Sequence, residues 1–251
     1  MDHYIITGAS RGIGEALAKA VAGPGTFVQT LSRGPVPELE AYFAHEKGNL
    51  LHHIVDLTND EAVRRFAGEA IACSLRKEPD GIFLINNAAL LEPVIPCGQE
   101  DPAVMEAHIR VNLIAPMILT SAFIRLLGHL DVPKTVVNIS SGAGRNPYAG
   151  WSSYCSSKAG LDMFTRCVAL EQAGERFPVK IIAIGPGIVD TDMQSLLRGK
   201  SEKDFPMKPK FIQLKESGKL SDPAGSASLL LRALKDVPSG TVSDVRELYG
   251  G

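Results

Sequence analysis

Short apolar runs of strand length alternate along the chain with longer amphipathic segments. The short runs are rich in β-branched residues and read HYIIT, TFVQTL, LLHHIVD, GIFLINN, KTVVNIS and VKIIAI. Between them, apolar residues recur with the spacing of a helix over residues 12–22, 59–77, 101–127 and 152–176. This alternation predicts one α/β domain over residues 1–251, with a parallel sheet covered by helices on both faces.

Residues 191–222 break this pattern, because charge increases, prolines interrupt and no strand-like run is present. Two interpretations remain open for this segment. It is either a solvated insertion or a mobile lid over a site at the carboxyl edge of the sheet, where open α/β folds bind ligands. A helical pattern then resumes in SDPAGSASLLLRALKD, with Ser221 or Asp222 as its N-cap and Pro223 in its first turn.

Composition narrows the function classes. The 251 residues carry a net charge of −2, which gives no electrostatic reason to expect nucleic acid or anionic lipid as a partner. The most apolar stretch is interrupted by Asn112, Pro116 and Arg125, so no membrane span is expected. The four cysteines lack CxxC spacing, the N-terminus lacks a signal-peptide pattern, and the six histidines form no ligand cluster. We therefore expect a cytoplasmic protein with free thiols and no bound metal.

The segment YIITGASRGIGEALAKAVA predicts a strand, a glycine-rich turn and a helix. Gly8, Gly12 and Gly14 follow a TGxxxGxG spacing in this turn. Glycine lets the chain reverse tightly and lets backbone approach a pyrophosphate, while the N–H groups at a helix start attract anions. The position after the first strand therefore favours a dinucleotide site over a purely structural turn.

Side chains near the predicted adenosine ribose favour NADP over NAD. NAD-binding folds usually place an acid at the end of the second strand. This chain has Ser32 and Arg33 there, and Arg11 lies within the glycine turn. Two guanidinium groups would bind a 2′-phosphate that a carboxylate would repel. Asp56, after the third strand, is placed either to meet the adenine edge or to cap the helix that starts near Thr58.

Tyr154 and Lys158 stand four residues apart in GWSSYCSSKAG, so both lie on one face of the predicted helix. A lysine ammonium beside a phenol favours the phenolate and is expected to lower the pKa of Tyr154 from its usual ~10. The pair would then act as an acid–base group. Ser141, at the carboxyl end of a predicted strand, could hold a substrate carbonyl against this phenol. Asn112 offers either a catalytic amide or a helix kink with a buried hydrogen bond.

These motifs, in this order, resemble the short-chain dehydrogenase/reductase family over nearly the whole chain. The resemblance implies a single-domain Rossmann fold with a doubly wound, seven-stranded parallel sheet. It assigns Tyr154 as the proton donor and Ser141 as the group that orients the carbonyl. Lys158 would lower the tyrosine pKa and bind the nicotinamide ribose, and Asn112 would hold a water in the proton relay. The resemblance rests on TGxxxGxG at 7–14, NNAA at 86–89 where the family has NNAG, Asn112, Ser141, the YCSSK box and GPGIVDTDM at 185–193.

The same resemblance implies a site for NADPH or NADP. Thr191 would contact the nicotinamide carboxamide. Ala89 replaces a family glycine, which would cost about 1 kcal/mol, chiefly in cofactor affinity, if that backbone needs a positive φ. The expected cofactor-binding residues are Gly8, Ser10, Arg11, Gly12, Ile13, Gly14, Ser32, Arg33, Asp56, Asn87, Ala88, Tyr154, Lys158, Pro186, Gly187, Val189 and Thr191.

Within the family, residues 146–172 and 186–194 are most similar to the sepiapterin reductase branch, which includes bacterial enzymes that reduce benzil to benzoin. In that branch an aspartate near the C-terminus anchors the substrate amine. Asp244 could match it or could simply end a strand, and Trp151 could border the substrate or only pack beneath a loop. The expected substrate-binding residues are Ser141, Trp151, Tyr154, Met193, Gln194 and Asp244.

Together these features predict an NADPH-dependent carbonyl reductase that acts on one ketone of an α-dicarbonyl such as benzil or sepiapterin. Hydride would pass directly from the nicotinamide to the carbonyl carbon. A reductase of 3-oxoacyl thioesters, or of a sugar or steroid ketone, is the main alternative, and a non-catalytic NADPH sensor is another. By analogy with the family, pairing through residues 101–127 and 152–176 predicts a homodimer or homotetramer.

Overall fold

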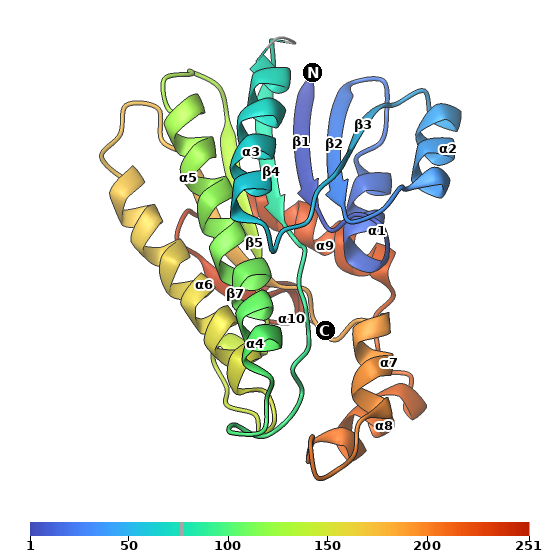
Figure 1. Ribbon diagram of the computed structural model, residues 1–251. Helices are drawn as coiled ribbons and strands as arrows, with labels where there is room; N and C mark the ends of the chain where they lie inside the picture. Colours follow the sequence, from blue (N-terminus) through green and yellow to red (C-terminus); the bar gives the residue numbers. More distant parts are fainter. Residues whose placement is uncertain (76–77, 251) are drawn as a thin grey trace.

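The computed structural model describes residues 1–75 and 78–250. Within these residues the chain forms a parallel sheet of seven strands in the order β3-β2-β1-β4-β5-β6-β7 (Figure 1). This order confirms the doubly wound parallel sheet and the Rossmann fold. The strands are β1 (Asp2–Thr7), β2 (Thr26–Ser32), β3 (Asn49–Ile54), β4 (Gly81–Asn86), β5 (Lys134–Ile139), β6 (Lys180–Gly185) and β7 (Val242–Asp244).

Helices cover both faces of this sheet. They are α1 (Gly12–Ala20), α2 (Pro37–His45), α3 (Asp60–Leu75), α4 (Pro102–Ile109), α5 (Ala115–Leu127), α6 (Ser152–Gln172), α7 (Asp192–Gly199), α8 (Lys208–Glu216), α9 (Pro223–Asp236) and α10 (Val245–Tyr249). One face carries α3, α5 and α6, and the other carries α1 and α9 (Figure 1).

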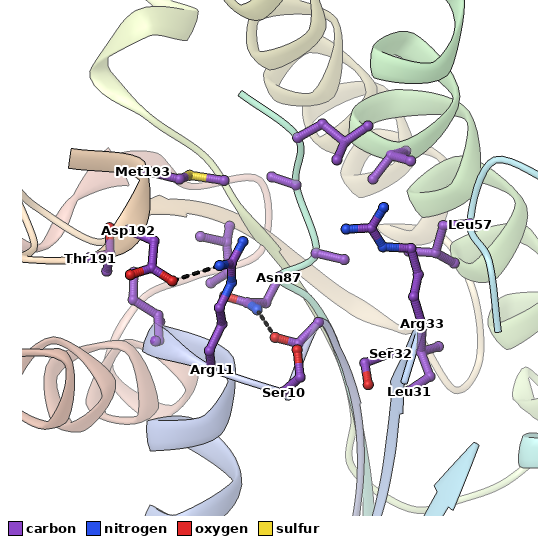
Figure 2. A pocket seen from close by; sticks show the side chains of 18 of the residues that line it. Ser10, Arg11, Leu31, Ser32, Arg33, Leu57, Asn87, Thr191, Asp192 and Met193 are labelled. Carbon is purple, nitrogen blue, oxygen red and sulfur yellow. Dashed lines mark hydrogen bonds and ion pairs between the residues drawn. The ribbon is translucent and has the colours of Figure 1, made fainter. Parts of the chain in front are cut away.

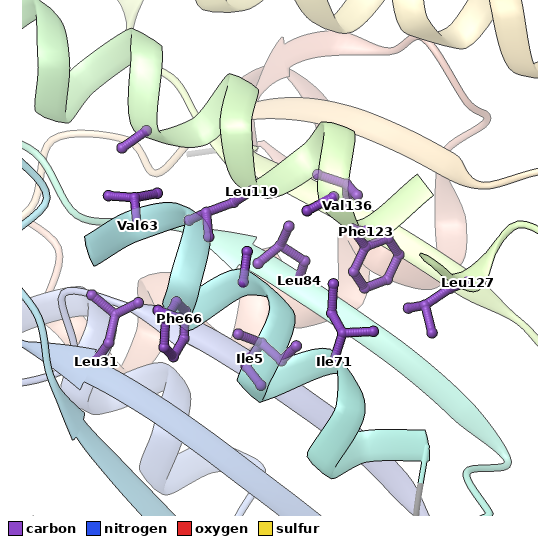
Figure 3. Close-up of a cluster of buried hydrophobic side chains, with 14 of the residues drawn as sticks. Ile5, Leu31, Val63, Phe66, Ile71, Leu84, Leu119, Phe123, Leu127 and Val136 are labelled. Carbon is purple, nitrogen blue, oxygen red and sulfur yellow. The ribbon is translucent and has the colours of Figure 1, made fainter. Parts of the chain in front are cut away.

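Successive residues of the central strands alternate between two apolar cores. Ile5 of β1 packs in one core with Phe66 of α3 and Phe123 of α5 (Figure 3). Ile6, the next residue, packs in the other core with Leu17 of α1. Because both faces are buried, the strands read as continuous apolar runs rather than as alternating ones.

The winding of the sheet reverses between β1 and β4. From β1, the chain proceeds outward to β2 and β3, and it then returns to add β4 on the other side of β1. Open α/β sheets bind ligands in the crevice outside the carboxyl ends of the strands at such a point. The glycine turn follows β1 and the NNAA segment follows β4, so the fold brings these two predicted cofactor segments together.

The predicted helix over 101–127 is interrupted. The structure has α4, then a π-helical turn (η1, Arg110–Ile114), then α5. Pro116 contributes to this break, because it has no N–H to donate to the carbonyl of Asn112 four residues earlier. The helix α2 was not predicted, since its pattern is short and begins at Pro37. The last two residues of the predicted helix 59–77 lie outside the described residues.

The same run is the one stretch of the described residues that is long and apolar enough to cross a membrane. It spans Pro102–Leu127, and 44% of its most apolar window is buried inside the protein. Phe123 and Leu127, from this run, are fully buried. The apolar character of the run therefore has an explanation in the core between α3, α5 and the sheet (Figure 3).

Residues 191–222 contain α7 and α8 and project past the carboxyl ends of the strands (Figure 1). An isolated bridge between Val189 and Ser221 closes the base of this segment. Asp222 caps the next helix, because its Oδ1 accepts a hydrogen bond of 2.8 Å from the backbone N–H of Gly225. This bond decides between the two predicted caps.

Candidate active site

A cavity of about 490 Å³ opens at the switch point of the sheet. Its walls come from the glycine turn, the ends of β2 and β4, and the start of the 191–222 segment (Figure 2). The structure thus brings together fourteen of the predicted cofactor residues, namely Gly8, Ser10, Arg11, Gly12, Ile13, Ser32, Arg33, Asp56, Asn87, Ala88, Tyr154, Lys158, Pro186 and Thr191.

Three predicted cofactor residues do not line this cavity. Gly14 lies beneath the turn, and a Cβ added there would be 2.2 Å from the carbonyl oxygen of Gly8. Gly187 has a φ of +82° and packs near Val245. Val189 is buried. We infer that these three residues shape the backbone of the site rather than face a ligand.

The glycine turn is fixed to the NNAA segment. Gly8 has a φ of +70°, and a Cβ there would lie 2.7 Å from the Cα of Ala88, so a larger residue would clash. The Asn87 side-chain amide donates to the carbonyls of Thr7 (2.9 Å) and Gly8 (3.2 Å). Asn87 is therefore a structural link between β1 and β4, as well as a wall of the cavity (Figure 2).

The two arginines that favoured NADP line the same cavity from different sides, Arg11 from the glycine turn and Arg33 from the end of β2 (Figure 2). Arg11 forms an ion pair of 2.6 Å with Asp192, the first residue of α7. Both side chains of this pair are 70% exposed, so the pair contributes little stability and can exchange for another partner. Arg33 is exposed just past the end of β2, where no carboxylate stands.

Two other polar residues predicted to bind the cofactor, Ser32 and Asp56, make hydrogen bonds within the protein. The Ser32 hydroxyl donates to the carbonyl of Gly34 at 2.7 Å, and the residue is 7% exposed. Asp56 Oδ1 accepts from both the backbone N–H and the hydroxyl of Thr58, each at 2.9 Å. Asp56 thus makes the turn before α3 and lines the cavity, as expected for a residue near the adenine. Its expected capping role is wrong, because α3 is capped by Asn59, whose Oδ1 accepts from the backbone N–H of Ala62 at 3.0 Å.

Tyr154, Lys158 and Ser141 come together beside the cavity, which Tyr154 and Lys158 line and Ser141 does not. Tyr154 and Lys158 lie on one face of α6 and are 8% and 3% exposed. The Ser141 hydroxyl is hydrogen-bonded to the Tyr154 phenol. Lys158 Nζ donates to the carbonyl of Ile139 at 2.8 Å and is 5.7 Å from the centre of the Tyr154 ring.

The expected direction of the tyrosine pKa is wrong for this structure. Burial raises the pKa of Tyr154 to about 12, although the hydrogen bond from Ser141 acts in the other direction. The phenol lies beneath Trp151, at 5.1 Å between ring centres, and loses its water there. Burial also lowers the pKa of Lys158 to about 8, partly offset by the charge of Asp162. The tyrosine is therefore held as a protonated donor.

Asn112 lies in the π-helical turn η1 and is 1% exposed. Its Oδ1 accepts from the backbone N–H of Leu90 at 2.7 Å, and its Nδ2 donates to the Leu90 carbonyl and to His108 Nε2. All polar atoms of this side chain thus have protein partners. The side chain matches the buried hydrogen bond that was one of its two expected roles, and it fixes the loop after β4.

An aromatic cluster covers the outer side of Tyr154. Trp151 contacts Tyr154, Phe205 and Phe211, with ring centres 5.0 to 5.8 Å apart. Phe205 is fully buried and, with Phe211, comes from the 191–222 segment. Two buried donors of predicted substrate residues, Trp151 Nε1 in this cluster and Gln194 Nε2 on α7, have no hydrogen-bond partner in the described part of the chain. Neither residue lines the cavity.

The predicted substrate residues lie in different places in the structure. Met193 lines the cavity, and Trp151 and Tyr154 belong to the aromatic cluster. Asp244 does not face the cavity. It is 1% exposed, caps α10, and both of its carboxylate oxygens accept from the Arg246 side chain. The carboxylate of Asp244 is therefore not free to anchor a substrate amine. Its position fits the alternative expectation, a residue that ends a strand.

The concern about Ala89 does not arise. Among the described residues, only Lys47 and Glu78 combine a side chain with a positive φ, so the backbone of Ala89 does not need glycine.

Sequence reasoning also missed part of the cavity wall. The missed residues are mostly apolar and look like ordinary core positions, although several adjoin a motif at a strand end: Leu31, Val55, Leu57, Thr58, Leu90, Val111, Ile139, Ser140, Asp190, Asp192 and Pro223.

The parallel sheet, the glycine turn at its switch point and the tyrosine–lysine pair beside the cavity define a dinucleotide-binding oxidoreductase. The sequence comparison is more specific. Residues 2–202 match the short chain dehydrogenase family, and the chain belongs to this family.

Relatives of known activity cover almost the whole chain. The chain is 42% identical over 250 residues to a benzil reductase ((S)-benzoin forming) of Bacillus subtilis, covering 98% of this chain and 99% of the relative. It is 34% identical to the sepiapterin reductase of Mus musculus, covering 92% and 90%. The crystal structure of a metagenomic short-chain oxidoreductase in complex with NADP superposes with a TM-score of 0.72 at 26% identity, covering 97% and 94%. These likenesses support a carbonyl reductase of the branch that the sequence motifs indicated.

Proposed function

We propose that this protein is an NADPH-dependent reductase of α-dicarbonyl compounds, in which Tyr154 protonates the carbonyl oxygen. One observation carries the proposal. The phenol of Tyr154 is protonated, is hydrogen-bonded to Ser141 and is one helical turn from Lys158. It lies between the cavity at the switch point and the aromatic cluster. The relatives named benzil reductase support the choice of substrate class.

The cavity residues fit a phosphorylated dinucleotide. Gly12 and Ile13, at the start of α1, present a helix N-terminus to the cavity, which suits a pyrophosphate. Arg33 and Arg11 suit a 2′-phosphate, and Thr191 lies opposite the glycine turn, 3.6 Å from where a Gly12 Cβ would be. When bound, the reduced nicotinamide supplies the hydride that reduces the carbonyl carbon.

The chain's own residues would orient and protonate the substrate. The Ser141 hydroxyl would hold the carbonyl oxygen against Tyr154, which gives up its proton as negative charge develops on that oxygen. The charge of Lys158 stabilises the phenolate that is left. If a water relays a proton here, we assign it to the backbone carbonyl of Asn112, since the side chain of Asn112 has protein partners and Pro116 offers that carbonyl no N–H.

The enclosure around Tyr154 favours an aromatic dicarbonyl over a 3-oxoacyl thioester. Trp151, Phe205 and Phe211 pack on one another beside Tyr154, so an aryl ketone would meet aromatic rings there once the segment that carries the two phenylalanines moves aside. The buried N–H groups of Trp151 and Gln194 lack partners, which suits a substrate with a second oxygen. We propose that residues 191–222, which carry the two phenylalanines, act as the substrate lid.

The function is tested by NADPH oxidation with benzil, sepiapterin and an acetoacetyl thioester under the same conditions. We expect the highest kcat/KM with benzil, by roughly fivefold or more over the thioester, because stacking of one ring contributes about 1 kcal/mol. Product chirality should be scored by chiral chromatography. Preference for the thioester would contradict the substrate class, and no turnover of any carbonyl would contradict the function.

Arg33→Asp tests the cofactor preference. We expect KM for NADPH to rise roughly 30-fold, because a charge-assisted hydrogen bond of about 2 kcal/mol is lost, and KM for NADH to fall. Arg65→Asp, on the exposed side of α3, introduces the same charge change away from the cavity. It should leave the ratio of KM for NADPH to KM for NADH unchanged. If both Michaelis constants remain at wild-type values in Arg33→Asp, this residue does not read the 2′-phosphate.

The pH dependence of reduction follows from two buried groups. Tyr154, with a pKa raised to about 12, holds its proton throughout the neutral range, whereas burial lowers the pKa of Lys158 to about 8. We therefore expect kcat for reduction to be level in mild acid and to fall as pH rises through about 8, where Lys158 loses its charge. A steady-state profile that stays flat to pH 9.5 would contradict this role of Lys158.

We also propose that the protein pairs through α4, α5 and α6. Large apolar side chains on these helices are partly exposed, and we propose that they meet a second copy of the chain. They are Val104, Met105, Met117, Met163 and Leu170. Sedimentation equilibrium should return the mass of a dimer or tetramer, and a monomer mass at micromolar concentration would contradict the proposal.

A further inference from the structure

A buried carboxylate lies directly behind the tyrosine–lysine pair. Asp162 is one helical turn past Lys158 and two turns past Tyr154 on α6, so the three side chains follow one face of the helix. Asp162 is 3% exposed. A buried carboxylate is costly unless it has partners, which raises the question of what this one does.

Three consecutive residues at the end of β5 and just after it each contact one residue on this face of α6. The Ile139 carbonyl accepts from Lys158 Nζ at 2.8 Å. The Ser140 hydroxyl donates to Asp162 Oδ1 at 2.5 Å. The hydroxyl of Ser141, the next residue, is hydrogen-bonded to Tyr154. Asp162 therefore holds the middle position of the segment that presents Ser141 to the phenol.

The other oxygen of Asp162 is sealed inside the protein. Oδ2 is buried and has no hydrogen-bond partner among the described residues. Gly144 closes over it, because a Cβ at that position would lie 2.6 Å from Oδ2. An oxygen without a hydrogen bond in this position interacts mainly through its charge. Lys158, one turn earlier on the same helix, has the largest effect of the three cations that act on it.

We propose that Asp162 is a positioning residue of the catalytic centre, whose charge keeps the buried Lys158 protonated and whose bond to Ser140 holds Ser141 against Tyr154. This inference rests on the proposed function, since it gives a role to a group that supports the proton donor. Asp162 itself contacts neither the phenol nor, on this geometry, a substrate.

The charges around the two groups agree with this role. Lys158 is faced by Asp162 and Tyr154 on its own helix and by His108 from α4, whose pKa burial lowers, so that it is uncharged at neutral pH. Asp162 is faced by Lys158 and Arg166 on α6 and by Arg145 from the loop after Gly144. Burial raises the pKa of Asp162, whereas these three cations and the Ser140 hydroxyl favour its ionised form.

Two variants separate the two parts of the role. Asp162→Asn removes the charge and keeps an acceptor for Ser140, so we expect the alkaline limb of kcat to move down by roughly one pH unit. The loss of kcat should be roughly fivefold at pH 8, where wild-type Lys158 is about half protonated, and less than about 1.5-fold at pH 6. Ser140→Ala keeps the charge and removes the bond, so kcat should fall several-fold at every pH while the limb stays in place.

The matched control is Glu171→Gln, which removes the same charge from an exposed position on the same helix and should leave the profile unchanged. Circular dichroism and NADPH binding report whether each variant is folded. If Asp162→Asn does not fold, Asp162→Ser takes its place with the same expectation. A limb that stays within 0.2 pH units of wild type in the charge-free variant would overturn the proposal.

A second readout needs no turnover. The Cε signal of Lys158 in 13C-lysine-labelled protein, assigned with Lys158→Arg, should titrate roughly one pH unit lower in Asp162→Asn than in wild type. An unchanged titration overturns the role of Asp162 even in an active enzyme. If the wild-type protein lacks reductase activity, but Lys158 still titrates about one pH unit lower in Asp162→Asn, the proposed function is refuted and the electrostatic role of Asp162 stands.

Discussion

Tyr154→Phe is expected to lower kcat for carbonyl reduction roughly 10³-fold, in the range that a positioned general acid contributes. The variant removes the one proton that the site holds ready beside the substrate oxygen. The ring itself remains, so its contacts with Trp151 and His108, at 5.1 and 5.9 Å between ring centres, remain as well. The protein should therefore stay folded with the enclosure in place.

Cofactor binding separates this loss from a general defect. NADPH fluorescence titration should give a dissociation constant within about threefold of wild type, since most of the cavity wall is untouched. Tyr42→Phe, on α2 at the surface, removes a phenol hydroxyl far from the cavity and should keep full activity. Turnover of Tyr154→Phe within about tenfold of wild type would show that another group, or water, delivers the proton.

The fold was largely predictable because its signals are local and repeated. Each predicted strand begins and ends within about two residues of the observed one, since both faces of a parallel sheet must be apolar. The turn at Gly8 was predictable for a similar reason, because a φ of +70° and the close approach of Ala88 admit only glycine. Each of these requirements restricts which residue types can occur at a position, so it can be recognised from the sequence alone.

The site was less predictable where a side chain's partners come from distant segments. Asp244 had the right position for a substrate anchor, but Arg246 and the capping of α10 occupy it. The direction of the Tyr154 pKa depended on how deeply Trp151 and the distant Phe205 bury the phenol, which no local motif encodes. The break at Asn112 was partly readable, from Pro116 four residues on.

Asp162 illustrates the same limit. Its spacing from Lys158 is visible in SSYCSSKAGLD, yet an acid at that spacing is usually a solvated surface residue. Only the fold shows that Ser140 and Gly144 close over it. Helix periodicity predicts which side chains share a face, whereas burial of that face depends on how β5 ends against α6.

Gly14→Ala is expected to destabilise the protein and to abolish useful cofactor binding. In an ordinary helix this change would be favourable by up to about 1 kcal/mol. Here the added Cβ would lie 2.2 Å from the Gly8 carbonyl oxygen and 2.4 Å from Asn87 Nδ2. Both neighbours belong to the turn that joins β1 to the NNAA segment, and one of them is backbone, so the turn must shift.

Overpacking of this kind costs roughly 1–3 kcal/mol, which corresponds to a fall in Tm of about 2–4 °C for each kcal/mol in a chain of this size. The displaced turn carries Gly8 and Gly12 in the cavity wall, so the dissociation constant for NADPH should rise more than tenfold. Gly68→Ala is the matched control, because Gly68 is also helical, in α3, and a Cβ there meets nothing within 4 Å. It should keep or raise Tm and leave NADPH binding unchanged. Equal effects of the two substitutions on Tm and on NADPH binding would mean that the close approach of α1 to the turn does not hold the cofactor site together.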